Sequence, residues 1–122
     1  MKVQKIFNAF TTYCNLFKLK CIGVQVGSKA RFCGDVSFSI KKPSRVILGK
    51  GLIITGGYNI NALSPSERSY ILVRKDSKLI IGDNCGFSSI YISVHLSVQI
   101  GNNVVIGAST KINDSNDHCI NY

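Results

Sequence analysis

Residues 100–118 read IGNNVVIGASTKINDSNDH, and this stretch decides the fold. Isoleucine recurs at a spacing of six, at Ile100, Ile106 and Ile112, and the next position of the series is occupied by His118. Three equally spaced aliphatic residues indicate three repeats of one structural unit. A histidine in the fourth place indicates that the chain leaves this regular path there, since a packed core favours an aliphatic residue.

The same unit occurs earlier in the chain, and its period indicates the fold. Ile81-Gly82-Asp83-Asn84 repeats the start of the stretch, and Leu48-Gly49-Lys50-Gly51 is a looser copy. A six-residue period is typical of a parallel β-helix, in which each unit supplies one short strand and a bend. Alternating aliphatic residues over 92–100 further predict a strand with one buried face, which places His95 on the opposite, outward face. We therefore predict an all-β parallel β-helix.

Composition restricts the protein to one folded domain. The 122 residues are 45% hydrophobic and 17% charged, which is ordinary for a globular domain. No apolar run approaches the length of a membrane span, and no secretory signal is visible, so we expect a cytoplasmic location. Five cysteines with no C-x-x-C pair argue against a zinc ribbon and a disulfide framework, and favour small buried side chains in a reducing compartment.

The formal net charge of +9 favours acidic partners. Nucleic acid, anionic lipid and a phosphate-bearing cofactor all meet that description. The basic residues occur in pairs such as Lys41-Lys42 and Arg74-Lys75 but form no long run, and no RNA-binding signature is present. We therefore expect no nucleic-acid partner.

The first 22 residues differ from the rest and predict a short N-terminal α-helix. Apolar residues recur at steps of three and four, as on one face of a helix: Val3, Ile6, Phe7, Phe10, Cys14 and Phe17. Such a helix could cap the open backbone edge of the β-helix, or it could make weak contact with an anionic membrane surface. We favour a cap at residues 1–22 followed by a repeat domain at 23–122, because the polar face is only mildly basic.

Together these motifs resemble the hexapeptide-repeat acyltransferases, and most closely the maltose, galactoside and polysaccharide O-acetyltransferases. The resemblance covers about three quarters of the chain, in the segments ARFCG (30–34), SKLIIGDNCGFSS (77–89), VQIGNNVVIGASTKI (98–112) and NDSNDH (113–118). It implies a left-handed coil and a homotrimer with active sites between subunits. It also implies an enzyme that transfers acetyl from acetyl-coenzyme A, with no metal, to a hydroxyl of a sugar or polysaccharide precursor.

The resemblance places the catalytic base at His118. An imidazole near neutral pKa can remove the hydroxyl proton as the oxygen attacks the thioester. Asp114 and Asn116 occupy the family's D-x-[DN]-x-H positions and would orient the imidazole or the acceptor, although such residues also favour turns.

Three further residues fall where relatives contact the acceptor. Ser88 and Ser89 correspond to the lining of the acceptor cleft, and His95 lies near a polar contact position. A turn role for the serines and a plain surface role for His95 stay open.

The sequence ends four residues after His118, whereas relatives continue into further coils that bind coenzyme A. We therefore expect a C-terminally truncated member of the family. The alternative to an enzyme is a non-catalytic β-helix scaffold or remnant. A zinc site of the kind found in γ-class carbonic anhydrases is disfavoured, because such a site needs three protein ligands and the chain has two histidines.

Overall fold

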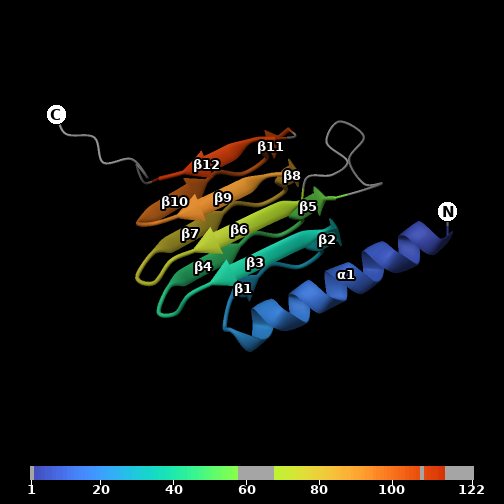
Figure 1. The fold of residues 1–122 in the computed structure, drawn as a ribbon, viewed down its shortest axis with the longest axis horizontal. Helices are drawn as coiled ribbons and strands as arrows, with labels where there is room; N and C mark the ends of the chain where they lie inside the picture. Colours follow the sequence, from blue (N-terminus) through green and yellow to red (C-terminus); the bar gives the residue numbers. More distant parts are fainter. Residues whose placement is uncertain (1, 58–67, 108, 115–122) are drawn as a thin grey trace.

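A computed structural model describes residues 2–57, 68–107 and 109–114, and within them the chain forms one helix and short strands that wind into stacked coils (Figure 1). The elements are α1 (Lys2–Cys21), β1 (Gln25–Val26), β2 (Arg31–Gly34), β3 (Val36–Ile40), β4 (Arg45–Leu48), β5 (Ile53–Gly56), β6 (Ser69–Val73), β7 (Lys78–Ile81), β8 (Gly86–Ser88), β9 (Tyr91–Val94), β10 (Ser97–Ile100), β11 (Val105–Ile106) and β12 (Lys111–Asn113).

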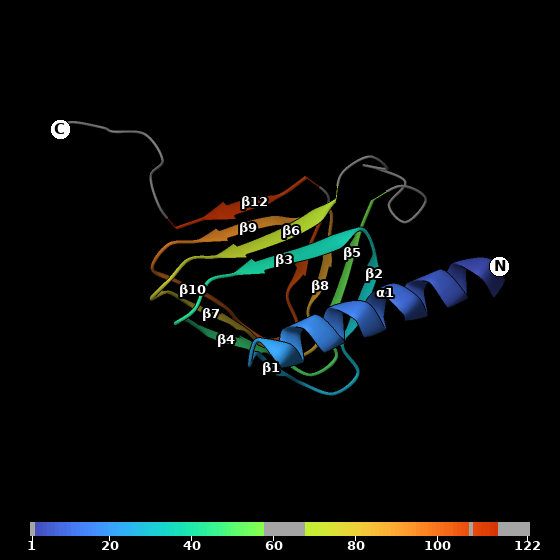
Figure 2. The same ribbon diagram turned by 60° about the horizontal axis from the view of Figure 1, so that its bottom comes forward.

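The strands form three sheets, and all neighbours in them are parallel. The first sheet has the order β1-β4-β7-β10, the second β11-β8-β5-β2 and the third β12-β9-β6-β3. Each coil thus visits the three sheets in turn, and successive coils stack (Figure 2). This architecture is consistent with the parallel β-helix and single short helix that the sequence predicts.

The core consists of aliphatic and aromatic columns that run along the stack. In the second sheet Phe32 lies beside Ile54, and Ile54 beside Phe87, and all three are at most 1% exposed. Similar columns fill the other sheets. Ile100, Ile106 and Ile112 continue one column each, on the first, second and third sheets. The three isoleucines therefore form one turn of the coil, as their spacing predicts.

The corner between the first and second sheets explains the recurring Gly-x-Asn pattern. A Cβ on Gly49 would lie 2.2 Å from the carbonyl oxygen of Gly82 in the next coil, so only glycine fits. In the later copies of the pattern, the asparagine lies two residues after the glycine. Asn84 and Asn103 adopt positive φ angles of 58° and 60°, which asparagine tolerates better than most residues.

Side chains at the same corner connect neighbouring coils. Asp83 accepts a hydrogen bond from the backbone N–H of Lys50 at 2.8 Å, and Asn102 accepts one from the N–H of Asp83 at 2.7 Å. Each carboxylate or amide oxygen thus satisfies a donor on the preceding coil that no strand partner reaches. The Asx residues of these turns are therefore structural links between coils.

Helix α1 lies against the first coil through a mixed face, on which Leu19 is fully buried and Thr11 and Thr12 make polar contacts. Thr11 and Thr12 donate hydrogen bonds to the carbonyl oxygen of Phe32 at 2.8 and 3.2 Å, and the Phe32 N–H donates to the Thr12 hydroxyl at 3.1 Å. These contacts cover the open edge of β2, as expected of a cap. The apolar side faces away, with Phe10 65% and Phe17 74% exposed, which is the reverse of the usual amphipathic arrangement.

The described part of the chain contains no helix with the length and apolar character needed to cross a bilayer.

Candidate functional site

The corner that leads from the third sheet to the first carries two of the candidate residues, His95 and Asp114. The strands that enter this corner are in register from coil to coil. The Lys41 N–H donates to the Val73 carbonyl at 2.9 Å, and the Arg74 N–H donates to the Val94 carbonyl at 3.0 Å. The residues after these strands therefore stack as Lys41, Arg74 and His95, one in each coil.

A second column of basic residues runs next to the first. Arg45 lies beside Lys78 at the start of the first sheet, in register. We call the six residues of the two columns and the turns between them the basic edge: Lys41, Lys42, Arg45, Arg74, Lys75 and Lys78. Neighbouring parallel strands lie about 4.8 Å apart, so like charges on successive coils repel each other. Asp76 is the one acidic residue within 41–45 and 74–78, so this edge favours an anion.

Asp114 lies at the end of the same corner, in the last described coil. Its carboxylate accepts hydrogen bonds from the backbone N–H groups of His95, Leu96 and Ser97 at 2.6, 2.8 and 2.7 Å. Desolvation by burial raises the pKa of this carboxyl, but the three N–H donors outweigh it, and the pKa is lowered from its ordinary value. The group is therefore ionised at neutral pH and anchors the chain at this corner.

His95 lies directly against this carboxylate. Its Nδ1 is 3.6 Å from Oδ1 of Asp114, and the two side chains are 20% and 16% exposed. The alternation over 92–100 predicts one continuous strand with His95 pointing outward. That prediction is wrong in detail: β9 ends at Val94 and β10 begins at Ser97, so His95 occupies a corner and is mostly enclosed.

Ser88 and Ser89 lie at the other end of β9 from His95. Ser88 ends β8, and its hydroxyl oxygen accepts a hydrogen bond from the Thr55 hydroxyl at 3.2 Å. Ser89 is 3% exposed with a φ of 48°, and its N–H donates to the Thr55 carbonyl at 2.9 Å. These contacts favour a role in shaping the corner between the second and third sheets. Contact of either serine with an acceptor stays a prediction.

The predicted base His118 and its neighbour Asn116 lie outside the described residues, as does Cys119. Of the six candidate residues, the structure thus brings together His95 and Asp114 and places Ser88 and Ser89 elsewhere. Among the residues that the structure describes, no three His, Cys, Asp or Glu side chains gather as a metal site would require. Cys85 is buried as expected, but Cys14 and Cys21 are exposed.

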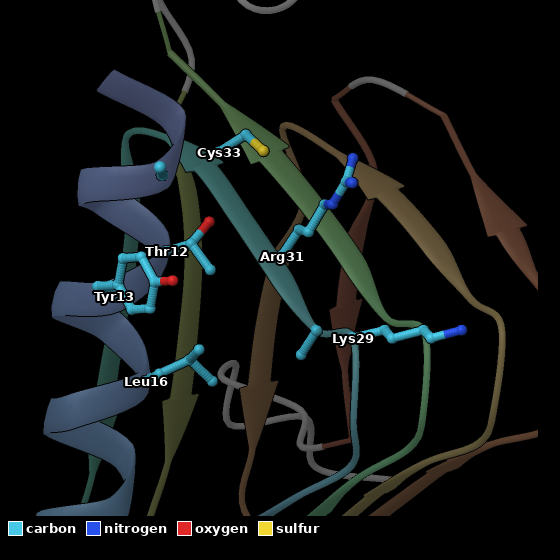
Figure 3. A pocket seen from close by; sticks show the side chains of 8 residues that line it. Thr12, Tyr13, Leu16, Lys29, Arg31 and Cys33 are labelled. Carbon is cyan, nitrogen blue, oxygen red and sulfur yellow. The ribbon is translucent and has the colours of Figure 1, made fainter. Parts of the chain in front are cut away.

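A separate groove lies between α1 and the outer face of β2 (Figure 3). It has a volume of about 890 Å³ and is lined by Ala9, Thr12, Tyr13, Leu16, Lys29, Ala30, Arg31 and Cys33. Burial raises the pKa of the Cys33 thiol, although Arg31 and a hydrogen bond with Thr12 oppose this effect. The thiol is therefore protonated at neutral pH and a weak nucleophile.

The basic edge was missed by sequence reasoning, although the pairs Lys41-Lys42 and Arg74-Lys75 were visible. These pairs are 33 positions apart, which is not a multiple of six, because a long insertion separates β5 from β6. Only the pairing of β3 with β6 in the structure shows that the two basic pairs lie side by side. A comparison with protein-family models, curated proteins and solved structures found no match.

Proposed function

We propose that the chain is an O-acetyltransferase, or a fragment of one, of the left-handed hexapeptide-repeat type. It transfers acetyl from acetyl-coenzyme A to a hydroxyl of a sugar or polysaccharide precursor, with His118 as the general base. Its active form is a homotrimer with the sites between subunits. The parallel three-sheet coil supports this class of fold, and the site rests on the corner that holds Asp114.

The proposed reaction needs one base and one oxyanion stabiliser. The imidazole of His118 takes the proton of the acceptor hydroxyl as that oxygen attacks the thioester carbonyl carbon. The C–S bond then breaks, and the coenzyme A thiolate leaves and receives the proton. Backbone N–H groups are the usual donors to the transient oxyanion. No covalent acetyl-enzyme forms, because the acceptor oxygen attacks directly.

The observation that carries the proposal is the anchoring of Asp114. Three backbone donors hold its carboxylate beside His95, four residues before His118 in the sequence. The segment that bears the base therefore begins at a fixed and negatively charged point. A carboxylate held in this way would favour an imidazolium brought next to it, and a general base becomes an imidazolium during the reaction.

The basic edge supports a substrate with phosphate or carboxylate groups. Coenzyme A carries phosphates, and many glycan precursors are anionic. Arg74 stacks directly below His95 in the coil, so an anion held along this edge lies next to the proposed site. Arg74→Gln should raise the KM for the anionic substrate several-fold and leave kcat nearly unchanged, since the contact is made in ground and transition states alike. Lys111→Gln, an exposed charge in β12, is the matched control; an equal effect of both would contradict a local anion site.

One observation favours the alternative, a non-catalytic scaffold. Asp83 and Asn102 make the same kind of contact as Asp114, from a side-chain oxygen to a backbone N–H of the preceding coil. At their corner no reaction is expected. Asp114 could thus be one more structural link.

Sugar-dependent release of coenzyme A separates the two functions. The wild-type protein is mixed with acetyl-coenzyme A and a panel of neutral and anionic sugars, and free thiol is followed continuously. Release that depends on one class of sugar supports the transferase. A folded protein that releases no thiol with any sugar and binds no coenzyme A by calorimetry supports the scaffold.

A further inference from the structure

The outward side of α1 presents a continuous apolar stripe. Ile6, Phe10, Tyr13 and Phe17 are 69%, 65%, 72% and 74% exposed. Their spacings of four, three and four place them on one face of the helix. The stripe consists of large exposed side chains, and Tyr13 at its edge also lines the groove beside β2, the strand that α1 covers (Figure 3).

This exposure follows from how α1 is attached. Thr11 and Thr12 bind the edge of β2 through their hydroxyls, and Leu19 is fully buried against the first coil. These contacts fix the rotation of the helix about its axis. The stripe cannot turn inward without breaking them, so the apolar side chains stay in water unless something else covers them.

The charge of the N-terminal segment favours a negatively charged partner for the stripe. The first 34 residues contain six basic residues and no acidic one: Lys2, Lys5, Lys18, Lys20, Lys29 and Arg31. Of these, the Lys18 ammonium donates to the Phe38 carbonyl oxygen on the coil side. Lys20 is exposed in the last turn of α1. A second copy of the chain, packed stripe to stripe, would bring two such basic segments together, and their charges would repel. An anionic lipid surface offers an apolar layer and a negative charge at the same time.

We propose that α1 binds an anionic membrane surface, with Ile6, Phe10, Tyr13 and Phe17 inserted at the boundary of headgroups and acyl chains. The helix lies in the plane of the interface. It is about 30 Å long, and the coils stay outside the membrane. This surface is separate from the Asp114 corner and does not depend on the proposed reaction.

Vesicle co-sedimentation of the full chain tests this. Vesicles of phosphatidylcholine alone are compared with vesicles of phosphatidylcholine and phosphatidylglycerol, at low and high salt. We expect binding to the anionic vesicles that is at least tenfold weaker at high salt, because the attraction is screened. No binding, or equal binding to neutral vesicles, would overturn the proposal.

Substitutions locate the contact. Phe10→Ser with Phe17→Ser should weaken vesicle binding at least tenfold, and Lys20→Gln about fivefold. All three residues are exposed, so the fold should persist, as circular dichroism will verify. Val105→Ser is the matched control, because Val105 is 83% exposed on the second sheet and should leave binding unchanged. If the double substitution instead dissociates an oligomer in light scattering and leaves vesicle binding intact, a second copy covers the stripe and the proposal is wrong.

Discussion

Removing the carboxylate of Asp114 should destabilise the last coil by an amount that the structure sets. Asp114→Ala removes the acceptor for three N–H groups at 2.6, 2.8 and 2.7 Å. A hydrogen bond to a charged group contributes about 1.5–3 kcal/mol when buried, but water can reach the donors of Leu96 and Ser97. We expect a total loss of about 2 kcal/mol in the free energy of unfolding. For a chain of this size, that lowers the Tm by roughly 6–10 °C.

The pH dependence provides the decisive part of this test. The pKa of Asp114 is lowered in the folded protein, so its contribution to stability is complete above the unfolded value of about 4. It disappears as the pH falls through the folded pKa, where the carboxylate becomes protonated. The Tm difference between wild type and Asp114→Ala should therefore be constant from pH 5 to 8 and shrink below about pH 4.

Thermal unfolding followed by circular dichroism measures both effects. Asp114→Asn keeps one acceptor oxygen without the charge, so we expect about half of the loss. Asp76→Asn, at an exposed turn carboxylate, is the control and should change the free energy of unfolding by less than about 0.5 kcal/mol. A wild-type Tm in Asp114→Ala at pH 7, or an undiminished deficit at pH 3, would refute the reasoning.

Two further substitutions test the packing of the coils. Gly49→Ala should lower the free energy of unfolding by several kcal/mol or prevent folding, because its Cβ would lie 2.2 Å from the Gly82 carbonyl oxygen. The Cβ of Gly86→Ala would meet nothing within 4 Å, so this variant should lose about 1 kcal/mol or less, as measured by chemical denaturation. Thr12→Val should lower the free energy of unfolding by about 1 kcal/mol and speed hydrogen exchange at the Phe32 amide, whose N–H it accepts. Equal stabilities of the two glycine variants, or an unchanged Phe32 exchange rate, would contradict the assigned contacts.

The repeat could be predicted from the sequence because buried aliphatic residues recur at fixed positions in each coil. Ile100, Ile106 and Ile112 each fall on a different sheet, so their spacing alone determines one turn of the architecture. The same kind of pattern led to a wrong prediction of one continuous strand at 92–100, because the alternation of aliphatic residues continues through the corner between β9 and β10. Leu96 satisfies the alternation but is 75% exposed there.

The orientation of α1 could not be predicted from its own sequence. Hydrophobic periodicity identifies an apolar face, and packing against another apolar surface would bury that face. The first coil instead offers the edge of β2, whose unpaired carbonyl and N–H groups at Phe32 require polar partners. Thr11 and Thr12 supply them, so the chemistry of the neighbouring strand overrides the amphipathic pattern.

The contacts of Asp114 could not be read from the sequence for a similar reason. The pairing of Asp114 with the 95–97 corner links positions up to 19 residues apart. Such contacts depend on which residues of neighbouring coils are paired. Corners of unequal length and the insertion between β5 and β6 change the number of residues per coil, so sequence spacing alone does not give this pairing. For the same reason the spacing did not show that Lys41 and Arg74 stack.

Acetyl transfer by the wild-type protein and by His118→Ala tests the central claim most directly. Both proteins, verified as folded and of equal oligomeric state, are incubated with acetyl-coenzyme A and the preferred sugar, and the acetylated product is quantified by mass spectrometry. We predict that His118→Ala lowers the rate by about 10²–10⁴-fold, the usual contribution of a general base. Transfer at the wild-type rate by His118→Ala would contradict the assignment of the base and with it the proposed mechanism.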